Sequence, residues 1–275
     1  MKPEEFRLLQ EFVTERYGIL VDPSKQRSLS SLLVPRLASL RLASFTEYYT
    51  YLKYSPQADR ELALLVPMLT NNETYFYREE PQLALLSRQI LPQVKKERSD
   101  GPCRALRILS AGCSTGEEAY TLALLVIESG LFLWDWDVRV TGVDVDGEAL
   151  AAAREGVYAG KSFHSLPERY RGRYFLPEGE RFRVRDNLRR ITSFRQGNLL
   201  EIDEVVEGEK MDVIFCRNVF IYFPLPVVRM VVERFIRLLL PGGWLFLGHS
   251  ESMSKVSDRF EPVHAGSGIA YRLRD

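Results

Sequence analysis

The sequence predicts an α/β protein with a doubly wound, mostly parallel sheet that follows a small all-helical N-terminal domain. Two observations carry this prediction. Beyond residue 81, short apolar segments alternate with amphipathic helical segments, which is typical of parallel strands joined by helices. Over residues 4–69, apolar residues recur at helical spacing. We expect a helical domain at 1–69, a linker at 70–80 that contributes to a cofactor site, and the sheet domain at 81–275.

The composition is that of an ordinary globular protein. The 275 residues are 45% hydrophobic, and 37 basic residues balance 37 acidic ones, so no overall basicity favours nucleic acid or an anionic membrane. The first residues lack the apolar core of a signal peptide, and no apolar run approaches the roughly 20 residues that span a bilayer. Three cysteines without metal-ligand spacing indicate reduced thiols of a cytoplasmic protein: Cys103, Cys113 and Cys216.

The N-terminal domain is predicted from helical spacing in two segments on either side of a turn at Asp22-Pro23, followed by a further helix at about 46–54. Pro67 is expected to interrupt the helices before the linker. The second helix carries a stripe of basic residues on its polar face: Lys25, Arg27, Arg36 and Arg41. This stripe is either a solvated face or a docking surface for an acidic partner.

The sheet domain is predicted from the same periodicities. The expected order is helix 81–97, strand 105–110, helix 117–130, strand 137–143, a helix that includes 149–154, strand 211–216, a helix at about 225–239, a turn at 241–243 and strand 244–248. The segment 211–216 is apolar almost without a break, as a strand buried on both faces must be.

Residues 173–195 interrupt this order with three segments in which apolar and basic residues alternate. The period of two predicts an antiparallel β-subdomain, inserted at about 170–195, with a basic outer face. Two interpretations stay open for it. It is either a stabilising flap or a docking site that accepts an extended peptide at its exposed edge.

The segment 105–122 predicts a strand, a tight glycine turn and a helix, which is typical of a nucleotide-type cofactor loop. Gly112 and Gly116 lack a Cβ, so the backbone can bend sharply and a ligand can approach it. Ser114 replaces the middle glycine of the dinucleotide fingerprint, and two acids follow the turn, which disfavours a phosphate. Glu117 could instead pair with the amine of a nucleoside ligand. S-adenosylmethionine is such a ligand.

Other polar residues follow the other strands, and ligands of doubly wound sheets bind at these carboxyl ends. Asp144 can accept hydrogen bonds from both ribose hydroxyls, although a helix N-cap is an equal alternative for it or Asp146. Asn198 and the backbone of Leu199 could bracket an adenine. Three side chains beyond the buried strand are expected to face the cleft: Arg217, Asn218 and Tyr222.

Five ordered motifs resemble the CheR family of chemotaxis receptor methyltransferases, and the resemblance covers nearly the whole chain. The motifs are Thr70–Glu79, Ser110–Glu118, Thr141–Asp146, Phe215–Phe223 and Leu240–Glu251. The resemblance implies a Rossmann-like, class I S-adenosylmethionine-dependent enzyme that esterifies glutamate side chains of chemoreceptors and releases S-adenosylhomocysteine. It further implies a cytoplasmic monomer that docks on the receptor through the basic second helix, with the β-subdomain as a second contact, and that neither binds nucleic acid nor inserts into the membrane.

The resemblance also implies roles for single residues. Arg78 and Tyr222 match the catalytic residues beside the reacting centre, and Arg78 also lies near the methionine carboxylate. With the glycine turn, the expected cofactor contacts are Asn72, Thr74, Arg78, Gly112, Gly116, Glu117, Asp144, Asn198, Leu199, Arg217 and Asn218. No metal site is expected, because the three histidines are scattered.

Several alternatives stay open. The chain could be a methyltransferase of another protein or of a small molecule, although the helical domain and the insertion favour a large protein substrate. It could be a non-catalytic module that binds the cofactor or its product and signals to a partner. A nucleotide-dependent oxidoreductase is disfavoured by Ser114 and the two acids after the turn. The loop Pro177–Glu180 lacks the glycine-rich segment associated with tethering to a receptor pentapeptide, which puts tethering in doubt.

Overall fold

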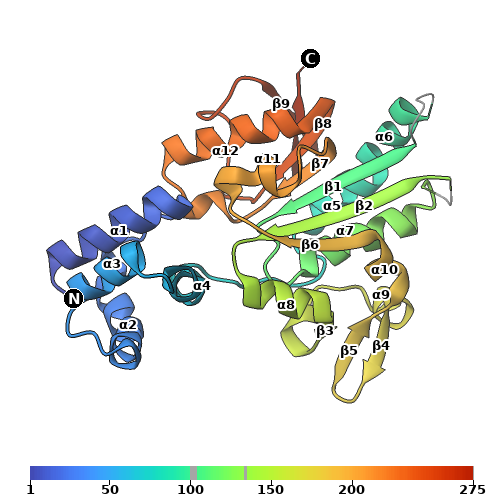
Figure 1. The fold of residues 1–275 in the computed structure, drawn as a ribbon. Helices are drawn as coiled ribbons and strands as arrows, with labels where there is room; N and C mark the ends of the chain where they lie inside the picture. Colours follow the sequence, from blue (N-terminus) through green and yellow to red (C-terminus); the bar gives the residue numbers. More distant parts are fainter. Residues whose placement is uncertain (100–103, 133–134, 275) are drawn as a thin grey trace.

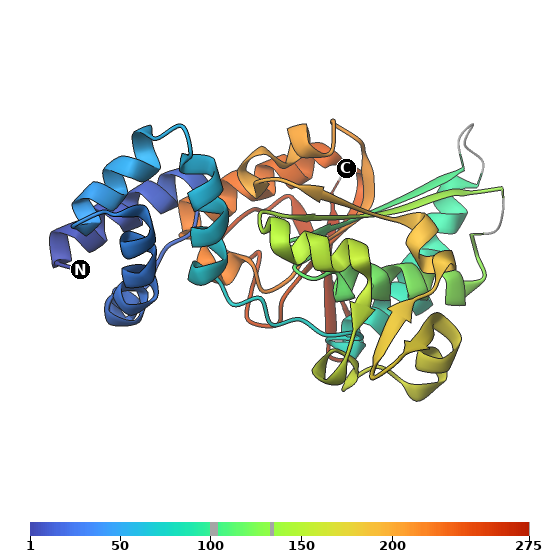
Figure 2. The ribbon, with the colours of Figure 1, turned by 60° about the horizontal axis from the view of Figure 1, so that its bottom comes forward.

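The computed structural model describes residues 1–99, 104–132 and 135–274. A helical domain lies beside one end of a sheet domain, and the chain passes from one to the other after the fourth helix (Figure 1). The turned view in Figure 2 shows the same arrangement, with residues near 220 next to the helical domain. Cys113 and Cys216 are buried free thiols, whereas the predicted thiol of Cys103 lies outside the described residues.

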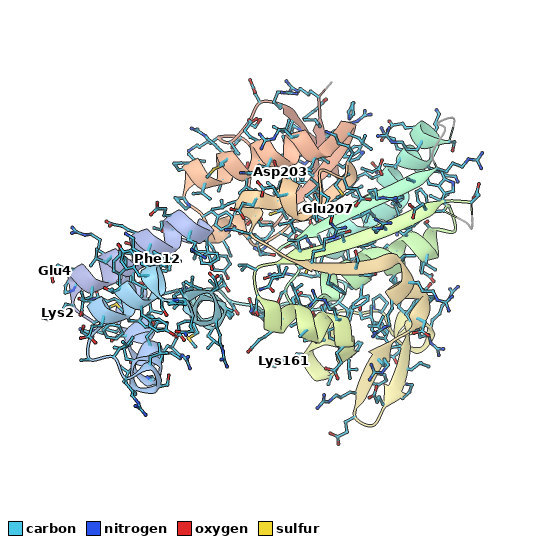
Figure 3. The ribbon with its side chains drawn as sticks, viewed as in Figure 1. Lys2, Glu4, Phe12, Lys161, Asp203 and Glu207 are labelled. Carbon is cyan, nitrogen blue, oxygen red and sulfur yellow. The ribbon has the colours of Figure 1, made fainter. Side chains whose placement is uncertain are left out.

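Four helices form the N-terminal domain: α1 (Pro3–Tyr17), α2 (Gln26–Leu40), α3 (Phe45–Tyr54) and α4 (Ala58–Leu69), with a 3-10 turn at Pro23–Lys25. They enclose a core of their own, and Phe12 of α1, labelled in Figure 3, packs edge-to-face on Tyr49 of α3 with ring centroids 5.9 Å apart. The predicted interruption at Pro67 is wrong, because α4 continues through this residue to Leu69. A proline in the last turn removes one hydrogen bond, which the buried face of α4 outweighs.

The predicted basic stripe is not one continuous surface. Arg36 forms a two-pronged ion pair with Glu61 of α4, at 3.0 and 2.6 Å. The hydroxyl of Tyr48 donates to the same carboxylate at 2.8 Å, and Glu61 is only 3% exposed. Because a buried carboxylate needs a counter-charge, Arg36 serves the helical core. The remaining members of the stripe are exposed: Lys25, Arg27 and Arg41.

The sheet domain holds seven paired strands in the order β6-β2-β1-β7-β8-β10-β9. Their bounds are β1 (Ala105–Ala111), β2 (Asp137–Asp144), β6 (Thr192–Gln196), β7 (Met211–Cys216), β8 (Leu239–Leu247), β9 (Phe260–Ala265) and β10 (Gly268–Leu273). The first five strands in this order run parallel, and β10 pairs antiparallel with β8 and β9. The predicted doubly wound, mostly parallel sheet is confirmed. The turn expected at 241–243 lies inside β8, where its pairing with β7 shifts register.

Helices cover both faces of this sheet. The helices of this domain are α5 (Glu80–Leu85) and α6 (Leu91–Arg98), joined by a π-turn at Leu86–Ile90, then α7 (Glu117–Ser129), α8 (Gly147–Glu155), α9 (Glu168–Tyr174), α10 (Asp186–Ile191), α11 (Ile202–Val205) and α12 (Leu225–Leu238). Of these, α9 packs on the inserted subdomain rather than on the sheet. Short 3-10 turns occur at Gly160–Phe163, Leu199–Glu201 and Phe220–Tyr222. On β7, Phe215 enters the core formed with α5 to α7, and Ile214 enters the core formed with α11 and α12. Alternate residues of one strand thus serve two cores.

The inserted subdomain is antiparallel, but its third strand differs from the prediction. The hairpin of β4 (Phe175–Glu178) and β5 (Arg181–Val184) pairs with β3 (Val157–Tyr158), in the order β3-β5-β4. The segment 190–195, predicted as the third strand, instead ends α10 and forms β6, which pairs in parallel with β2. Period-two alternation marks a strand in either sheet, so periodicity alone does not assign its partner.

No helix within the described ranges is both long and apolar enough to cross a membrane. The same ranges contain no group of three or more His, Cys, Asp or Glu side chains that could hold a metal ion.

Candidate active site

A pocket opens at the carboxyl ends of β1, β2 and β7, where the strand order reverses, and the end of α1 closes part of it. Most of the predicted site residues line it: Asn72, Thr74, Arg78, Gly112, Asp144, Asn198, Leu199, Arg217, Asn218 and Tyr222. Gly116 and Glu117 do not. The wall also includes residues that sequence reasoning missed, among them Tyr17, Ile19 and Glu118.

The two glycines of the turn after β1 have different surroundings. Gly112 lines the pocket with φ 80°, and a Cβ on it would lie 2.5 Å from Cγ2 of Val219. Gly116 has φ 92°, but a Cβ there would lie 2.8 Å from Ala153 and 3.0 Å from the ring of Phe194. The predicted ligand contact at Gly116 is therefore corrected. This glycine lets the start of α7 pack closely on α8 and β6.

The turn does not offer a row of amides to a phosphate. The N–H groups of Gly112 and Cys113 both donate to the carbonyl oxygen of Val143, at 2.8 and 3.0 Å. The N–H of Ser114 donates to Asp144 at 2.7 Å. Because the fold itself uses these donors, the loop supplies shape rather than an anion cradle. This agrees with the sequence-based argument against a phosphate ligand.

Glu117 turns away from the pocket. The hydroxyls of Thr115 and Ser162 donate to its carboxylate at 2.6 and 2.9 Å, and the side chain is buried. Burial raises the pKa of Glu117, while the hydroxyl donors act in the opposite direction. The predicted contact between Glu117 and a ligand amine is therefore corrected. Its carboxylate is committed to the junction between α7 and the inserted subdomain.

Glu118, and not the predicted Glu117, faces the pocket. It lines the pocket and accepts hydrogen bonds from Ser110 Oγ and Arg217 Nε, both at 2.7 Å. Successive residues of a helix lie about 100° apart around its axis, so two adjacent acids cannot both face one cleft. The register of α7 against the sheet decides between them. In the sequence, the only indication of Glu118 is that two glutamates are adjacent after the turn.

Asp144 ends β2 with its carboxylate at the pocket wall. Its two oxygens accept the backbone N–H groups of Ser114 at 2.7 Å and Asp146 at 2.9 Å. Burial raises the pKa of Asp144, which these amides oppose. The alternative N-cap role belongs to Asp146, which accepts the N–H groups of Glu148 and Ala149 at the start of α8. Since each carboxylate oxygen can accept more than one bond, Asp144 keeps capacity for ligand hydroxyls.

The side chains of Asn218 and Asn198 differ in how many of their polar atoms form hydrogen bonds within the protein. The Oδ1 atom of Asn218 is buried without a hydrogen-bond partner among the described residues, at a position that lines the pocket. An orphaned acceptor of this kind marks a place where a ligand donor fits. Asn198 instead donates to the carbonyl oxygen of Arg16 at 2.7 Å and accepts the N–H of Leu200 at 3.0 Å. Its amide therefore ties α1 to the sheet domain and still keeps one N–H and one lone pair. The adenine contact of Asn198 and the Leu199 backbone stays a prediction, and both residues line the pocket.

The linker closes one side of the pocket and is fixed to the loops around it. Asn72 donates to Asp146 at 2.8 Å, and the Asn72 carbonyl oxygen accepts a hydrogen bond from Ser114 Oγ at 3.2 Å. Arg217, whose side chain is 2% exposed, donates to the carbonyl oxygen of Arg78 at 2.9 Å. Arg217 is therefore satisfied by the fold while it lines the pocket.

Arg78 and Tyr222 both lie against this linker. The guanidinium of Arg78 donates to the carbonyl oxygen of Glu73 at 3.0 Å and lies 5.5 Å from the ring centre of Tyr75. The hydroxyl of Tyr222 accepts the N–H of Asn71 at 3.0 Å and donates to the Asn71 carbonyl at a longer 3.4 Å. The structure thus brings a cation and a hydroxyl to the linker side of one pocket.

Comparison with known families decides what this pocket is. A family model described as the CheR methyltransferase SAM-binding domain matches residues 72–269, and one described as the CheR methyltransferase all-alpha domain matches residues 4–70. The chain belongs to the CheR methyltransferase family. It is therefore an S-adenosylmethionine-dependent methyltransferase.

Curated relatives of this CheR methyltransferase extend over most of the chain. It is 39% identical over 258 residues to chemotaxis protein methyltransferase 2 of Pseudomonas aeruginosa, covering 92% of this chain and 88% of the relative. It is 36% identical over 257 residues to chemotaxis protein methyltransferase 2 of Vibrio cholerae, covering 93% and 88%. It is 35% identical over 260 residues to the chemotaxis protein methyltransferase of Escherichia coli, covering 93% and 86%.

The pocket of this CheR methyltransferase fits S-adenosylmethionine in three respects. Asp144 offers a carboxylate to hydroxyls, Glu118 offers one to an ammonium, and Asn218 offers an acceptor that the protein leaves unsatisfied. Each is a group that a nucleoside carrying a cationic amine requires.

Proposed function

We propose that this CheR methyltransferase transfers methyl groups to glutamate side chains of chemoreceptors, forming glutamyl methyl esters for sensory adaptation. The observation that carries the proposal is that Arg78 and Tyr222 lie on the linker side of a pocket that fits S-adenosylmethionine. A carboxylate is the acceptor group that a guanidinium and a hydroxyl together recognise. The relatives named as chemotaxis protein methyltransferases support the chemotaxis context.

In this proposal different pocket residues contact different parts of the cofactor. Asp144 accepts hydrogen bonds from the ribose hydroxyls, and Glu118 faces the amino group. The adenine lies beside the backbone of Leu199, and Asn218 Oδ1 accepts a donor from the cofactor. Residues of the linker and the turn complete the enclosure: Asn72, Thr74 and Gly112.

When bound, S-adenosylmethionine supplies a methyl group made electrophilic by its sulfonium. A glutamate, with a pKa near 4.3, is already ionised at neutral pH, so the protein need not remove a proton. Arg78 and Tyr222 orient the carboxylate towards the methyl group. Hydrogen bonds that fix direction matter more here than a full ion pair, which would weaken the nucleophile. The 3.4 Å contact from the Tyr222 hydroxyl to Asn71 is long, so this hydrogen can turn to the acceptor.

Recognition of the receptor is proposed to use charge. Lys25, Arg27 and Arg41 are exposed near the two ends of α2 and suit an acidic receptor surface. Arg36 is left out of this surface because it pairs with Glu61. The β-subdomain is a second contact, and the enzyme acts as a monomer.

The experiment uses methyl-labelled S-adenosylmethionine and membranes that carry the cognate chemoreceptors. Label on the receptor that mild base releases as methanol would establish an ester. Wild-type protein and the matched control Arg88→Ala, which changes an exposed arginine outside the pocket wall, should transfer label, and Arg78→Ala should not. If the wild type binds cofactor but places no base-labile label on the receptor, a different substrate or a non-catalytic sensor takes the place of this proposal.

A further inference from the structure

The segment that follows β8, Gly248–Glu251, lies outside the pocket wall, yet Glu251 reaches the loop that carries Asn218 and Tyr222. One carboxylate oxygen, Oε2, accepts the N–H of Gly248 at 2.6 Å and the N–H of Asn218 at 3.0 Å. The other, Oε1, accepts the N–H of Ile221 at 3.2 Å. One side chain thus gathers amides from the start and the end of the loop.

An ionised carboxylate suits this position, because neither of its oxygens carries a hydrogen and three N–H groups can converge on it. Burial raises the pKa of Glu251, and the same backbone amides act in the opposite direction. Bonds from amides to a charged acceptor are also stronger than neutral ones. A carboxamide of the same shape would turn an NH₂ group towards amides that are themselves donors.

The backbone around Glu251 is packed to accommodate these contacts. A Cβ on Gly248 would lie 2.8 Å from the nitrogen of Asn218 and 2.9 Å from Oε2 of Glu251. Asn218 has a left-handed φ of 60°, a conformation that asparagine adopts more readily than other residues with a Cβ. Its side-chain oxygen has no partner among the described residues, so the direction of this oxygen depends on how firmly the surrounding backbone is held.

We propose that Glu251 is a positioning residue of the active site. By holding the amides of Asn218 and Ile221 against the end of β8, it fixes the loop 217–223. The loop then presents Asn218 Oδ1 to the cofactor and the Tyr222 hydroxyl to the acceptor carboxylate. The part that concerns Tyr222 rests on the proposed function, whereas the part that concerns Asn218 requires only that the pocket binds the cofactor.

The test compares Glu251→Gln with the matched control Asp212→Asn. Asp212 is a buried carboxylate at the opposite end of β7, where it accepts the N–H of Arg107 at 2.9 Å and Arg98 Nε at 3.0 Å. Both variants remove a carboxylate that accepts a backbone amide, so both should lower thermal stability. Gly248→Ala is the second variant, because it disturbs the same contact from the other side.

Three quantities are measured on the purified full chain: hydrogen exchange of the Asn218 and Ile221 amides, affinity for S-adenosylhomocysteine by calorimetry, and turnover at saturating substrates. Glu251→Gln should speed exchange at these two amides about 10- to 100-fold and lower affinity and turnover about 10-fold each. Gly248→Ala should change them in the same direction. Asp212→Asn should leave all three within about twofold of the wild type.

The proposal is overturned if Glu251→Gln leaves exchange at Asn218 and Ile221 unchanged. It is equally overturned if product affinity and turnover match those of Asp212→Asn despite faster exchange. If the wild type transfers no methyl group to any receptor, the proposed function is wrong, but this result alone says nothing about the role of Glu251. Exchange and product affinity then still decide whether Glu251 positions Asn218.

Discussion

Two carboxylates at opposite ends of the same sheet show how the fold separates structural charge from charge left for a ligand. At the amino end of β7, Asp212 pairs with Arg98 at 3.0 Å and accepts the amide of Arg107. At the carboxyl end of β2, Asp144 accepts only backbone amides among its described partners and faces the pocket. Burial raises the pKa of both carboxyl groups. The kind of partner, rather than burial, is what distinguishes them.

The same contrast holds elsewhere. Arg36 and Glu61 satisfy each other inside the helical domain, whereas Asn218 Oδ1 at the pocket has no described partner. A polar group that the fold neutralises contributes to stability, and one that the fold leaves open contributes to binding. Glu118 lies between the two cases, because it pairs with Arg217 and still lines the pocket.

Replacing Asp144 should have a larger effect on ligand affinity than any other substitution considered below. Asp144→Ala should lower affinity for S-adenosylhomocysteine about 100-fold, because two hydrogen bonds to a charged acceptor are lost. Its melting temperature should also fall, because the N–H groups of Ser114 and Asp146 lose their acceptor. Asp212→Asn should likewise lower stability but leave this affinity unchanged. Calorimetric titration and thermal unfolding of both variants check this, and equal loss of affinity in the two would remove the distinction between the ends of the sheet.

The second effect concerns the helical domain. Arg36→Ala should lower the free energy of unfolding by about 2 kcal/mol, because Glu61 keeps a buried charge without its counter-ion; the partial exposure of Arg36 keeps the loss below that of a fully buried pair. Arg27→Ala should leave stability unchanged and weaken the association with receptor. Urea unfolding and receptor binding separate the two. A stable Arg36→Ala variant with impaired receptor binding would restore the continuous basic stripe.

The third effect separates orientation from binding. Tyr222→Phe should lower turnover about 10-fold, because one hydrogen bond to the acceptor carboxylate is lost. Affinity for S-adenosylhomocysteine should stay within about twofold. Steady-state kinetics and calorimetry give the two values. Equal losses in both would assign Tyr222 to cofactor binding.

The fourth effect compares the neighbouring acids. Glu118→Gln should weaken S-adenosylhomocysteine binding about 10-fold, since it removes the charge that faces the amino group. Glu117→Gln should change this affinity less than twofold. A titration that shows the larger loss at Glu117 would favour the residue that the sequence alone suggests.

The sequence predicts the parts of this molecule that depend on local pattern. The strand at 211–216 is recognisable because both its faces are apolar, and Asp144 is recognisable because it follows a strand directly. What it misses depends on register and tertiary pairing. The choice between Glu117 and Glu118 requires the rotation of α7, and the place of 190–195 requires knowing that β2 has a free edge.

Other misses have the same origin. Nothing in the helix end at Tyr17 indicates that it closes a pocket lined mostly by residues between 70 and 223. The pairing of Arg36 with Glu61 joins two helices whose packing no periodicity reveals. Local pattern therefore locates the strand ends, and tertiary structure selects which neighbouring side chains face the ligand.

The smallest expected effect is a pH dependence at Glu117. Burial raises its pKa in the folded chain above the ordinary 4.5, so the folded state binds the proton more tightly than the unfolded state. Wild-type stability therefore falls as the pH rises from about the unfolded value through the folded one. Glu117→Gln should lack this loss, and its stability relative to the wild type should rise over the same window. Urea unfolding at pH 4 and pH 8 checks the sign, and an advantage confined to acid pH would contradict it.

S-adenosylmethionine should bind at the carboxyl edge of the sheet, with its reacting end open to Arg78 and Tyr222. A crystal structure of the complex with S-adenosylhomocysteine would test this binding mode. We expect ribose hydroxyls within hydrogen-bond distance of Asp144, the amino group near Glu118, and the sulfur facing Arg78 and Tyr222. A ribose bound away from Asp144, or a sulfur turned from these two side chains, would contradict it.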